Sequence, residues 1–281
     1  MDTVVWFDGR WHEDSNPALL GGLDQASWMS TMVFDGARAF DGLAPDLDRH
    51  CERLLRSAKS LLMNPPVEAA FVERLCREAI AKFEPGAHLY VRPMIWAREG
   101  FVLPEPDSAV FALVVHRAPL PEFKGISVCL STRRRPAPDM APTDAKASCL
   151  YPNTQRAVLE ARQRGFDGCI LLDPWGAVAE LATSNVWIAK AGVAITPEPN
   201  GTFLAGVTRA RVMGLLRGAG VEVREAKLTW DDVMAADEVF STGNFAKVQS
   251  IVRVEDRALQ PGPIVRKARE LYWEFARTQP V

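Results

Sequence analysis

The sequence lacks the features that mark membrane proteins, nucleic-acid-binding proteins and metalloproteins. Its 281 residues include no apolar run near the roughly 18 residues that a membrane span requires. The 33 Lys and Arg residues are balanced by 35 Asp and Glu. The formal net charge of −2 therefore gives no reason to expect nucleic acid or an anionic membrane as a partner. The four histidines form no HExxH motif, so we expect no metal site.

The cysteines form no CxxC pair, and their odd number and wide spacing argue against a disulfide framework. They are expected to be reduced and mostly buried thiols in a cytoplasmic protein. The N-terminal stretch is acidic and has too few apolar residues to be expected as a signal peptide. The five positions are Cys51, Cys76, Cys129, Cys149 and Cys169.

Composition and patterning predict a mixed α/β protein with two domains. Hydrophobic residues make up 48% of the chain and charged residues 24%, which is an ordinary globular balance. The stretch 118–125 contains two prolines and a glycine between apolar strands, so it is the expected linker. It would join an N-terminal α/β domain at 1–117 to a C-terminal domain at 126–281.

Hydrophobic periodicity and turn residues give the expected elements of each half. Asp8-Gly9 predicts a hairpin turn, and Asp35-Gly36 predicts a second turn that breaks a β-rich stretch. The first half is expected to contain a hairpin at 4–12, strands within 28–40, helices at 46–62 and 67–83, and strands at 87–96 and 109–115. The second half is expected to contain strands at 126–130, 169–172, 177–180, 185–190, 193–196, 221–224, 238–241 and 249–254, helices at 151–165, 206–218, 230–235 and 264–277, and a polar loop at 242–245.

Lys146 is the first candidate for covalent chemistry. It lies among small residues in an expected loop, and Tyr151 follows five residues later at the start of a helix. An accessible amine in such a place could form a Schiff base. Lysine is common, so Lys146 alone is weak evidence. Glu180 ends an apolar strand, where a lone carboxylate requires a partner.

Several segments could bind an anion. Gly206, Val207 and Thr208 begin an expected helix, and the N-terminus of a helix attracts negative charge. The loop from Thr242 to Asn244 could supply further backbone N–H groups. Arg53 could hold a phosphate through its guanidinium, although an arginine on an amphipathic helix is most often solvated.

Other arginines have two interpretations each. Tyr90 and Arg92 share one face of an expected strand, where they could hold a substrate carboxylate or form an ion pair at the rim. Arg38 is expected in a surface or structural ion pair. The run from Arg133 to Arg135 would ordinarily be a solvated patch, but it lies just before Lys146, so one of its members could face a pocket.

The order of these motifs resembles the class IV, or fold type IV, aminotransferases. That family contains branched-chain aminotransferases, D-amino-acid transaminases and (R)-selective amine transaminases, all dependent on pyridoxal phosphate. Five motifs occur in the family's order, from near residue 3 to the C-terminus. They are His50-x-x-Arg53-Leu54, Lys146 with Tyr151, Leu171-Leu-Asp-x-x-Gly-x-Val-x-Glu180, Ser184-Asn185-Val186, and Gly206-Val207-Thr208-Arg209.

The resemblance implies a role for each matching residue. Lys146 resembles the Schiff-base and proton-transfer lysine, Tyr151 the tyrosine at the cofactor's phenolic oxygen, and Glu180 the acid at the pyridine nitrogen. Phosphate contacts are implied for Arg53, Val207, Thr208, Thr242 and Asn244. Substrate contacts are implied for Phe34, Tyr90, Arg92, Arg133 and Phe245. The implied fold is a smaller N-terminal α/β domain and a larger C-terminal pseudo-barrel domain, with the cofactor between them in a homodimer.

The substrate is less determined than the reaction class. Trp28-Met29-Ser30 stands where branched-chain enzymes usually have His-Tyr-Gly, and Gly243-Asn244-Phe245 replaces their Gly-Thr-Ala turn. A branched-chain-like transaminase with an altered pocket is the first hypothesis, and an (R)-amine:pyruvate or D-amino-acid transaminase is the alternative. Aminodeoxychorismate lyase is a further alternative on the same fold. A binding protein without activity is disfavoured, because the lysine, the tyrosine and the acid are all present.

Overall fold

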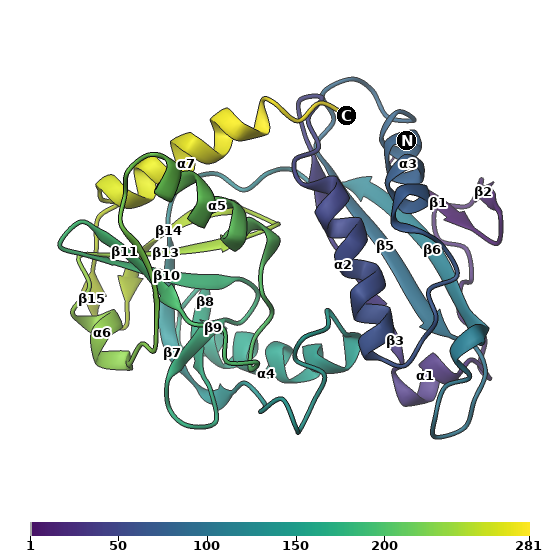
Figure 1. Cartoon of the computed structure of the whole chain (residues 1–281), viewed down its shortest axis with the longest axis horizontal. Helices are drawn as coiled ribbons and strands as arrows, with labels where there is room; N and C mark the ends of the chain where they lie inside the picture. Colours follow the sequence, from purple (N-terminus) through teal and green to yellow (C-terminus); the bar gives the residue numbers. More distant parts are fainter. Residues whose placement is uncertain (1) are drawn as a thin grey trace. The chain divides into compact units, whose positions relative to one another are not determined.

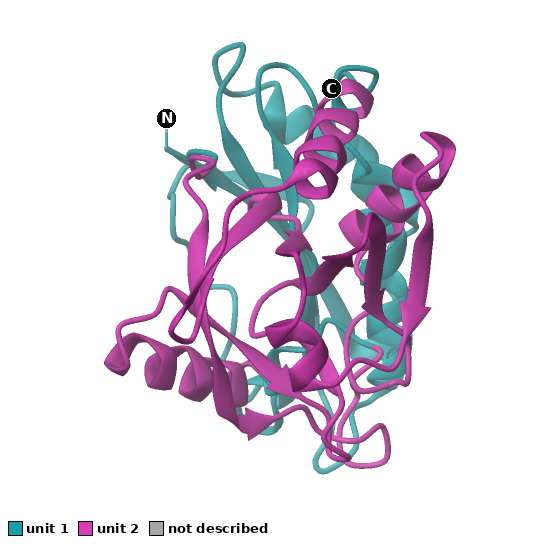
Figure 2. Ribbon diagram, turned by 90° about the vertical axis from the view of Figure 1, so that its left-hand side faces the viewer, with its two compact units in different colours: residues 1–120, 145–150, 276–281 teal, residues 121–144, 151–275 magenta. Residues whose placement is uncertain are grey.

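The computed structural model describes residues 2–281 and divides into two compact units (Figures 1 and 2). The first unit runs to Leu120 and also includes Ala145–Leu150 and Ala276–Val281. The second contains Pro121–Asp144 and Tyr151–Phe275. The expected boundaries did not anticipate the two short segments that join the first unit, and the division into two domains stays a prediction. Residue 1, where the expected N-terminal domain begins, lies outside the described residues.

The first unit is built on one antiparallel sheet, in the order β2-β1-β6-β5-β3 with β4 also paired to β5. Its strands are β1 (Thr3–Phe7), β2 (Arg10–His12), β3 (Met32–Phe34), β4 (Ala37–Ala39), β5 (Leu89–Ala97) and β6 (Ala109–Arg117). Its helices are α1 (Gln25–Met29), α2 (Leu47–Ser60) and α3 (Ala69–Ile80), with the 3₁₀ turns η1 (Pro106–Ser108) and η2 (Ser148–Leu150).

Helices α2 and α3 cover one face of this sheet (Figure 1). Alternate residues of β5, such as Leu89, Val91 and Ile95, point into a core that includes Leu54 of α2 and Val72 of α3. The intervening residues of β5 therefore point to the opposite face. That face carries a smaller apolar cluster around Trp96 and, further along β5, the polar side chains described below.

Two expectations for the first unit were wrong. Asp35-Gly36 does not reverse the chain: β3 and β4 both run antiparallel to β5, so together they form one interrupted strand. Trp28 and Met29 belong to α1 and not to a strand. The buried side chain of Ala26 packs this short helix onto Phe7 and Trp96, and this tertiary contact overrides the β preference of the aromatic residue.

The second unit is built on a larger mixed sheet, in the order β12-β11-β10-β13-β14-β7-β8-β9 with β15 also paired to β14. Strand β9 also lies beside β10, so the sheet curls back on itself as expected for a pseudo-barrel. Its strands are β7 (Ile126–Arg134), β8 (Gly168–Leu172), β9 (Val178–Leu181), β10 (Asn185–Lys190), β11 (Val193–Pro197), β12 (Val223–Ala226), β13 (Glu238–Gly243), β14 (Lys247–Val254) and β15 (Arg257–Ala258). Its helices are α4 (Tyr151–Gln163), α5 (Val207–Gly218), α6 (Trp230–Met234) and α7 (Pro263–Ala276).

Two strands of this unit are longer than expected. Strand β13 continues through Thr242 and Gly243, so only Asn244 to Ala246 remain as a connecting loop. Strand β7 extends through Arg133 and Arg134, with a register shift against β8 after Leu130. The expected loop at 242–245 was therefore too long.

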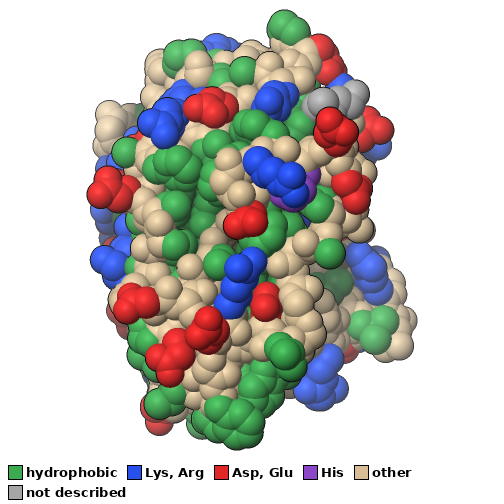
Figure 3. All heavy atoms as spheres, turned by 90° about the vertical axis from the view of Figure 1, so that its right-hand side faces the viewer, with side chains coloured by type: hydrophobic (Ala, Val, Ile, Leu, Met, Phe, Trp, Pro, Cys, Tyr) green, Lys and Arg blue, Asp and Glu red, His purple; other side chains and the backbone are tan. Residues whose placement is uncertain are grey.

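On the face drawn in Figure 3, acidic and basic side chains are interspersed among hydrophobic and neutral ones, without a large patch of one charge. Within residues 2–281, no helix is long and apolar enough to cross a membrane. Over the same residues, no cluster of three or more His, Cys, Asp and Glu side chains could hold a metal ion.

Candidate functional site

Asp35, at the break between β3 and β4, is the centre of a buried ionic network in the first unit. The Arg53 guanidinium donates from Nε to Asp35 Oδ2 at 2.7 Å and from Nη2 to Oδ1 at 2.8 Å. His50 Nδ1 lies 2.7 Å from the same Oδ1. The motif His50-x-x-Arg53 places both side chains on one side of α2, so the helix presents two basic groups to a single carboxylate.

These contacts determine the ionisation of Asp35. Burial by itself raises the pKa of this carboxyl, but the charges and hydrogen bonds of Arg53 and His50 lower it by more. The pKa of Asp35 therefore lies well below its usual range. Arg53, expected at a cofactor phosphate, uses two of its nitrogens here to hold the strand break against α2, and its phosphate role stays a prediction.

A row of polar side chains crosses the face of the first sheet that α2 and α3 do not cover. Arg38, Tyr90 and His116 are successive Cα partners across β4, β5 and β6, so their side chains leave the sheet on the same side. Arg92 lies two residues from Tyr90 on that side. The rings of Tyr90 and His116 are 5.6 Å apart. The expectation that Tyr90 and Arg92 share a face agrees with this register.

Positive charge dominates this row. Arg38, expected in a surface or structural ion pair, is fully buried and not at the surface; burial lowers its pKa to about 10, and it donates to the Ala118 carbonyl. Burial, with the charges of Arg92 and Arg38, also lowers the pKa of His116. Arg92 Nε is buried and has no hydrogen-bond partner among the described residues. An anion placed here would meet several donors.

Lys146 reaches the same side of the first sheet. Its ammonium lies 4.8 Å from the centre of the Phe34 ring, and Phe34 is paired with Met94 of β5 on that side. The backbone fixes the segment: Lys146 N donates to Ser57 Oγ at 3.0 Å, and Phe34 N donates to Lys146 O at 3.1 Å. The first unit thus brings together four predicted site residues, namely Phe34, Tyr90, Arg92 and Lys146.

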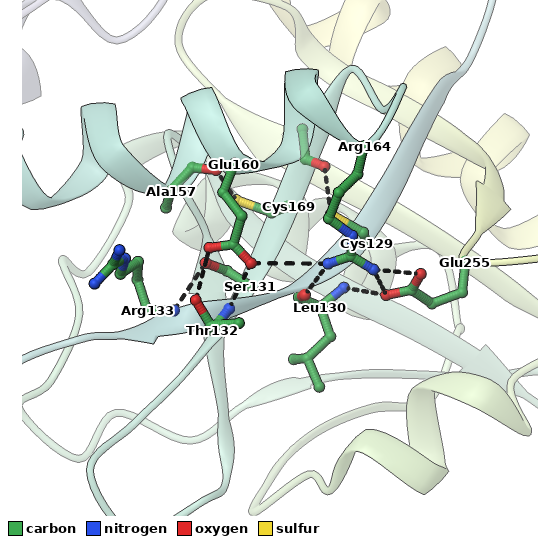
Figure 4. Close-up of polar contacts among 11 residues, drawn as sticks. Cys129, Leu130, Ser131, Thr132, Arg133, Ala157, Glu160, Arg164, Cys169 and Glu255 are labelled. Atoms are coloured by element: carbon green, nitrogen blue, oxygen red, sulfur yellow. Dashed lines mark hydrogen bonds and ion pairs between the residues drawn. The ribbon is translucent and has the colours of Figure 1, made fainter.

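Tyr151 begins α4, which is tied firmly to the second sheet (Figure 4). Glu160 on α4 accepts three hydrogen bonds from Ser131 and Thr132 of β7. Arg164, one turn later, donates to the Leu130 carbonyl at 2.7 Å and to both carboxylate oxygens of Glu255. These charge-assisted contacts hold the far end of α4 and so limit the movement of the helix that carries Tyr151.

Glu180 at the end of β9 is held on both carboxylate oxygens. Arg135 Nε lies 3.2 Å from Oε1, and Asn185 Nδ2 lies 3.4 Å from Oε2. All three side chains are buried. Arg135 Nε also donates to the Thr202 carbonyl at 2.9 Å, and Asn185 Nδ2 donates to the Leu204 carbonyl at 3.0 Å. The carboxylate therefore has the partner that its buried position requires.

Arg133, the expected pocket arginine, is exposed, and its guanidinium points away from Glu160 (Figure 4). Of the three consecutive arginines it is Arg135 that is buried against a predicted site residue. Strand alternation could not single it out, because Arg133 and Arg135 are two residues apart and would face the same side, whereas Arg135 lies just beyond the end of β7. The substrate role expected for Arg133 stays a prediction.

The expected anion-binding segments of the second unit lie side by side. Asn185 of β10 is the Cα partner of Thr242 of β13. Gly206, just before α5, lies so close to Asn185 that a Cβ on it would be 2.0 Å from Asn185 Oδ1. Val207 and Thr208 are buried in the first turn of α5. The second unit thus brings Glu180 together with Val207, Thr208 and Thr242 around Asn185.

The loop after β13 adds two predicted residues, and the first residue of β14 adds one that was not predicted. Phe245 is exposed, whereas Asn244 has a buried Nδ2 without a hydrogen-bond partner among the described residues. Asn244 Oδ1 accepts from the ammonium of Lys247 at 2.8 Å. A buried amide donor without a partner is uncommon in proteins, and an acceptor on a ligand would satisfy it.

Comparison with known proteins identifies the family of this chain. Residues 32–254 match the family model described as "Amino-transferase class IV". The chain is a class IV aminotransferase. An aminotransferase from Brucella abortus, solved with the cofactor PLP, is 45% identical, with a TM-score of 0.96 over 99% of this chain and 100% of that one. The resemblance inferred from the five motifs and the expected fold class are confirmed.

Other relatives of this aminotransferase are named for branched-chain substrates. A probable branched-chain-amino-acid aminotransferase from Aquifex aeolicus is 32% identical over 88% of this chain and 84% of its own length. A branched-chain aminotransferase from Thermoproteus uzoniensis, solved with norvaline, is 30% identical, with a TM-score of 0.90 over 98% of this chain and 94% of that one.

Proposed function

We propose that this class IV aminotransferase moves an amino group from an α-amino acid of the branched-chain type to a 2-oxo acid. Its cofactor is pyridoxal 5′-phosphate, as in the similar structure from Brucella abortus. An amino acid is favoured over a simple amine as the donor because Arg38, Tyr90, Arg92 and His116 form a row on one face of the first sheet. The names of several relatives support branched-chain substrates.

The residues present fit a phosphorylated cofactor. The buried and unpartnered Nδ2 of Asn244 is a donor that an oxyanion would satisfy. The buried Glu180, oriented by Arg135 and Asn185, is the acid suited to the pyridine nitrogen. In this assignment Val207, Thr208, Thr242, Asn244 and Arg53 hold the phosphate and Tyr151 contacts the phenolic oxygen. When bound, the cofactor supplies an electron sink for the carbanion formed at the substrate Cα.

Lys146 is assigned the covalent attachment of the cofactor and the movement of the Cα proton. Its ammonium lies over the Phe34 ring, and its backbone is fixed by Ser57 and Phe34, so the amine sits on a rigid support. A proton-transfer group needs a fixed position more than it needs strength, because the reacting atoms must be within hydrogen-bond reach. Phe34 supplies an apolar surface on one side of the amine.

The row of basic side chains suits a substrate carboxylate. Arg92 Nε is a buried donor without a hydrogen-bond partner among the described residues, and an ionised acceptor would satisfy it. The pKa of His116 is lowered by burial and by the charges of Arg92 and Arg38, so this face disfavours a further positive charge. A primary amine without a carboxylate would leave these donors unused, at a cost in binding.

A half-reaction measurement tests the proposal. Purified enzyme is mixed separately with L-leucine, D-alanine and (R)-1-phenylethylamine, and the absorbance of the bound cofactor is followed as the pyridoxamine form appears. We expect rapid conversion by L-leucine and little by the amine. Equal conversion by (R)-1-phenylethylamine contradicts the proposal, and preference for D-alanine supports the D-amino-acid alternative. A separate assay with aminodeoxychorismate and no amino acceptor tests the lyase alternative, which release of pyruvate would support.

The variant Arg92→Gln tests whether the polar face of the first sheet binds the substrate carboxylate. Loss of a charged hydrogen bond is worth about 1.5–3 kcal/mol, so we expect KM for L-leucine to rise about 10-fold to 150-fold while kcat changes less. Arg56→Gln, in the exposed i,i+4 pair with Glu52 on α2, is the matched control and should leave KM within about twofold. An unchanged KM in Arg92→Gln would remove this arginine from the substrate site.

We also propose that the enzyme acts as a homodimer. The first unit exposes several large apolar side chains, and the rings of Trp28 and Phe101 lie 5.1 Å apart, so part of this surface is continuous. Exposed apolar patches of this kind commonly mark interfaces. Sedimentation of the wild type should give a dimer, and Phe101→Asp should shift it towards monomer; a monomeric wild type would contradict the proposal. The apolar side chains are Leu20, Leu23, Trp28, Met29, Phe101, Val102 and Leu103.

A further inference from the structure

Lys247 is a buried cation at an unusual backbone position. It begins β14, its side chain is 1% exposed, and its φ is 61°. Gly243 is its Cα partner, so Asn244 to Ala246 form a three-residue loop that Lys247 closes. Left-handed residues in such loops are ordinarily glycine or asparagine. A buried lysine with a left-handed backbone is rare, which indicates that its side chain makes a contact needed at this position.

That contact is a hydrogen bond with the side chain of Asn244. The Lys247 ammonium donates to Asn244 Oδ1 at 2.8 Å. An ammonium group can only donate, so the atom that faces it must be the amide oxygen. This fixes the amide orientation and directs Nδ2 to the other side, where it is buried and has no hydrogen-bond partner among the described residues. Lys247 thus prepares a donor that no group of the described chain uses.

The neighbouring backbone indicates what would accept from this donor. Asn244 follows Thr242 and Gly243 at the end of β13, and Thr242 is paired with Asn185 beside the start of α5. The N-terminus of a twelve-residue helix and a fixed amide donor, with an ammonium behind the amide, together favour an oxyanion. The charge of Lys247 also polarises the Asn244 amide and so would strengthen a hydrogen bond donated by Nδ2 to a ligand.

We propose that Lys247 is a positioning residue that orients Asn244 Nδ2 towards an oxyanion bound at this end of the second sheet. The oxyanion is the phosphate of the cofactor or the carboxylate of the substrate, which share the chemistry of a planar or tetrahedral group with several acceptor oxygens. The inference rests on the proposed function for the identity of the ligand. Its structural basis is separate, because the Lys247–Asn244 contact and the unused Nδ2 lie wholly within the second unit.

The test compares ligands with and without a phosphate. Full-length enzyme freed of cofactor is titrated with pyridoxal 5′-phosphate and with pyridoxal, and binding is followed by tryptophan fluorescence. If the anion is the phosphate, Lys247→Met weakens pyridoxal 5′-phosphate by about tenfold or more and leaves pyridoxal unchanged. If the anion is the substrate carboxylate, cofactor binding is unchanged and KM for L-leucine rises by a similar factor with kcat retained. Either result supports the proposal.

A double-mutant cycle tests whether Lys247 acts through Asn244. We expect Asn244→Ala to weaken the same ligand, and Lys247→Met to add no more than about twofold in that background. Lys247→Arg keeps a cationic donor and should retain most of the affinity; if Lys247→Met does not fold, Lys247→Arg and Asn244→Ala decide. Lys190→Met, on an exposed lysine of β10 in the same sheet, is the control and should bind both ligands as the wild type does.

Two results would contradict the proposed role of Lys247. Unchanged affinity for the cofactor together with unchanged KM for the donor in Lys247→Met would show that the lysine has no role at the anion. Losses that multiply in the double variant would show that Lys247 does not act through Asn244. If the wild type fails to convert L-leucine but its affinities respond as expected, the proposed function fails and the role of Lys247 stands.

Discussion

Arg135 Nε lies 3.2 Å from Oε1 of Glu180, and both side chains are buried. Glu180 is the carboxylate that we propose to contact the pyridine nitrogen. The positive charge of Arg135 stabilises its negative charge, and the Thr202 carbonyl fixes the guanidinium at 2.9 Å. Arg135 is thus the residue that keeps a buried carboxylate oriented, a role that Asn185 shares at the other oxygen.

Replacement of Arg135 by methionine should lower both stability and cofactor function. Removing one partner of a buried ion pair leaves the other charge uncompensated, so the free energy of unfolding is expected to fall by about 3–5 kcal/mol. Urea unfolding measures this loss. The pH dependence of the bound cofactor's absorbance should also shift, because Glu180 loses its fixed orientation, and Arg135→Lys should restore part of both properties.

The control for this pair is Arg134→Met, one residue earlier. Arg134 is exposed, and its side chain donates to the Pro174 carbonyl at 2.8 Å, so its loss should cost less than about 1 kcal/mol. If Arg135→Met unfolds at the same urea concentration as Arg134→Met and keeps the absorbance profile of the wild type, the ion pair has no role in holding Glu180.

Much of this architecture follows from local sequence. The helical spacing of Leu47, Leu54 and Ala58 predicted α2 because one face of it had to be buried. Gly206-Val207-Thr208 predicted the start of α5 to within one residue. The alternation of Tyr90 and Arg92 predicted their shared face. In each case the deciding interaction lies within a few residues along the chain.

The features that the sequence did not reveal depend on contacts far along the chain. Asp35 looked like a turn residue because nothing nearby shows that β3 and β4 pair with the same strand. Arg135 could not be chosen over Arg133, because the contacts that bury Arg135 are with Glu180 and Thr202, far along the chain. Lys247 was missed because its left-handed backbone and its contact with Asn244 arise only when the hairpin closes.

Asp35→Asn should destabilise the enzyme in a pH-dependent way. The pKa of Asp35 lies below its unfolded value of 3.8, so its stabilising effect is fully present above about pH 4 and is lost as pH falls. At pH 7 we expect the variant to lose about 3–5 kcal/mol, because Arg53 and His50 then face an uncharged group. The difference from wild type should shrink below pH 4 in urea unfolding. Asp14→Asn, on an exposed loop, should show neither effect; a pH-independent loss in Asp35→Asn would contradict the ionic origin.

Gly206→Ala tests the close approach of α5 to Asn185. Its φ of −70° suits alanine, so any effect must be steric. The new Cβ would lie 2.0 Å from Asn185 Oδ1 and would force that side chain off Leu204 O and Glu180. We expect a loss of about 1–3 kcal/mol and weaker binding of pyridoxal 5′-phosphate. Gly214→Ala, in the same helix with open space around it, should gain about 0.5–1 kcal/mol. Equal behaviour of the two variants would show that Asn185 moves without cost.

Lys146→Ala should separate chemistry from folding. The segment that carries Lys146 is fixed by its backbone, through Ser57 Oγ and Phe34 N, and alanine keeps both contacts. We therefore expect the same unfolding midpoint and the same sedimentation as the wild type. Turnover should fall by at least about 10³-fold, since the amine that moves the Cα proton is gone. Lys59→Ala, on the exposed last turn of α2, should remain fully active. Methylamine added to Lys146→Ala should restore part of the lost turnover, because a small free base can take the vacated place, whereas full activity without it would assign the proton transfer to another residue.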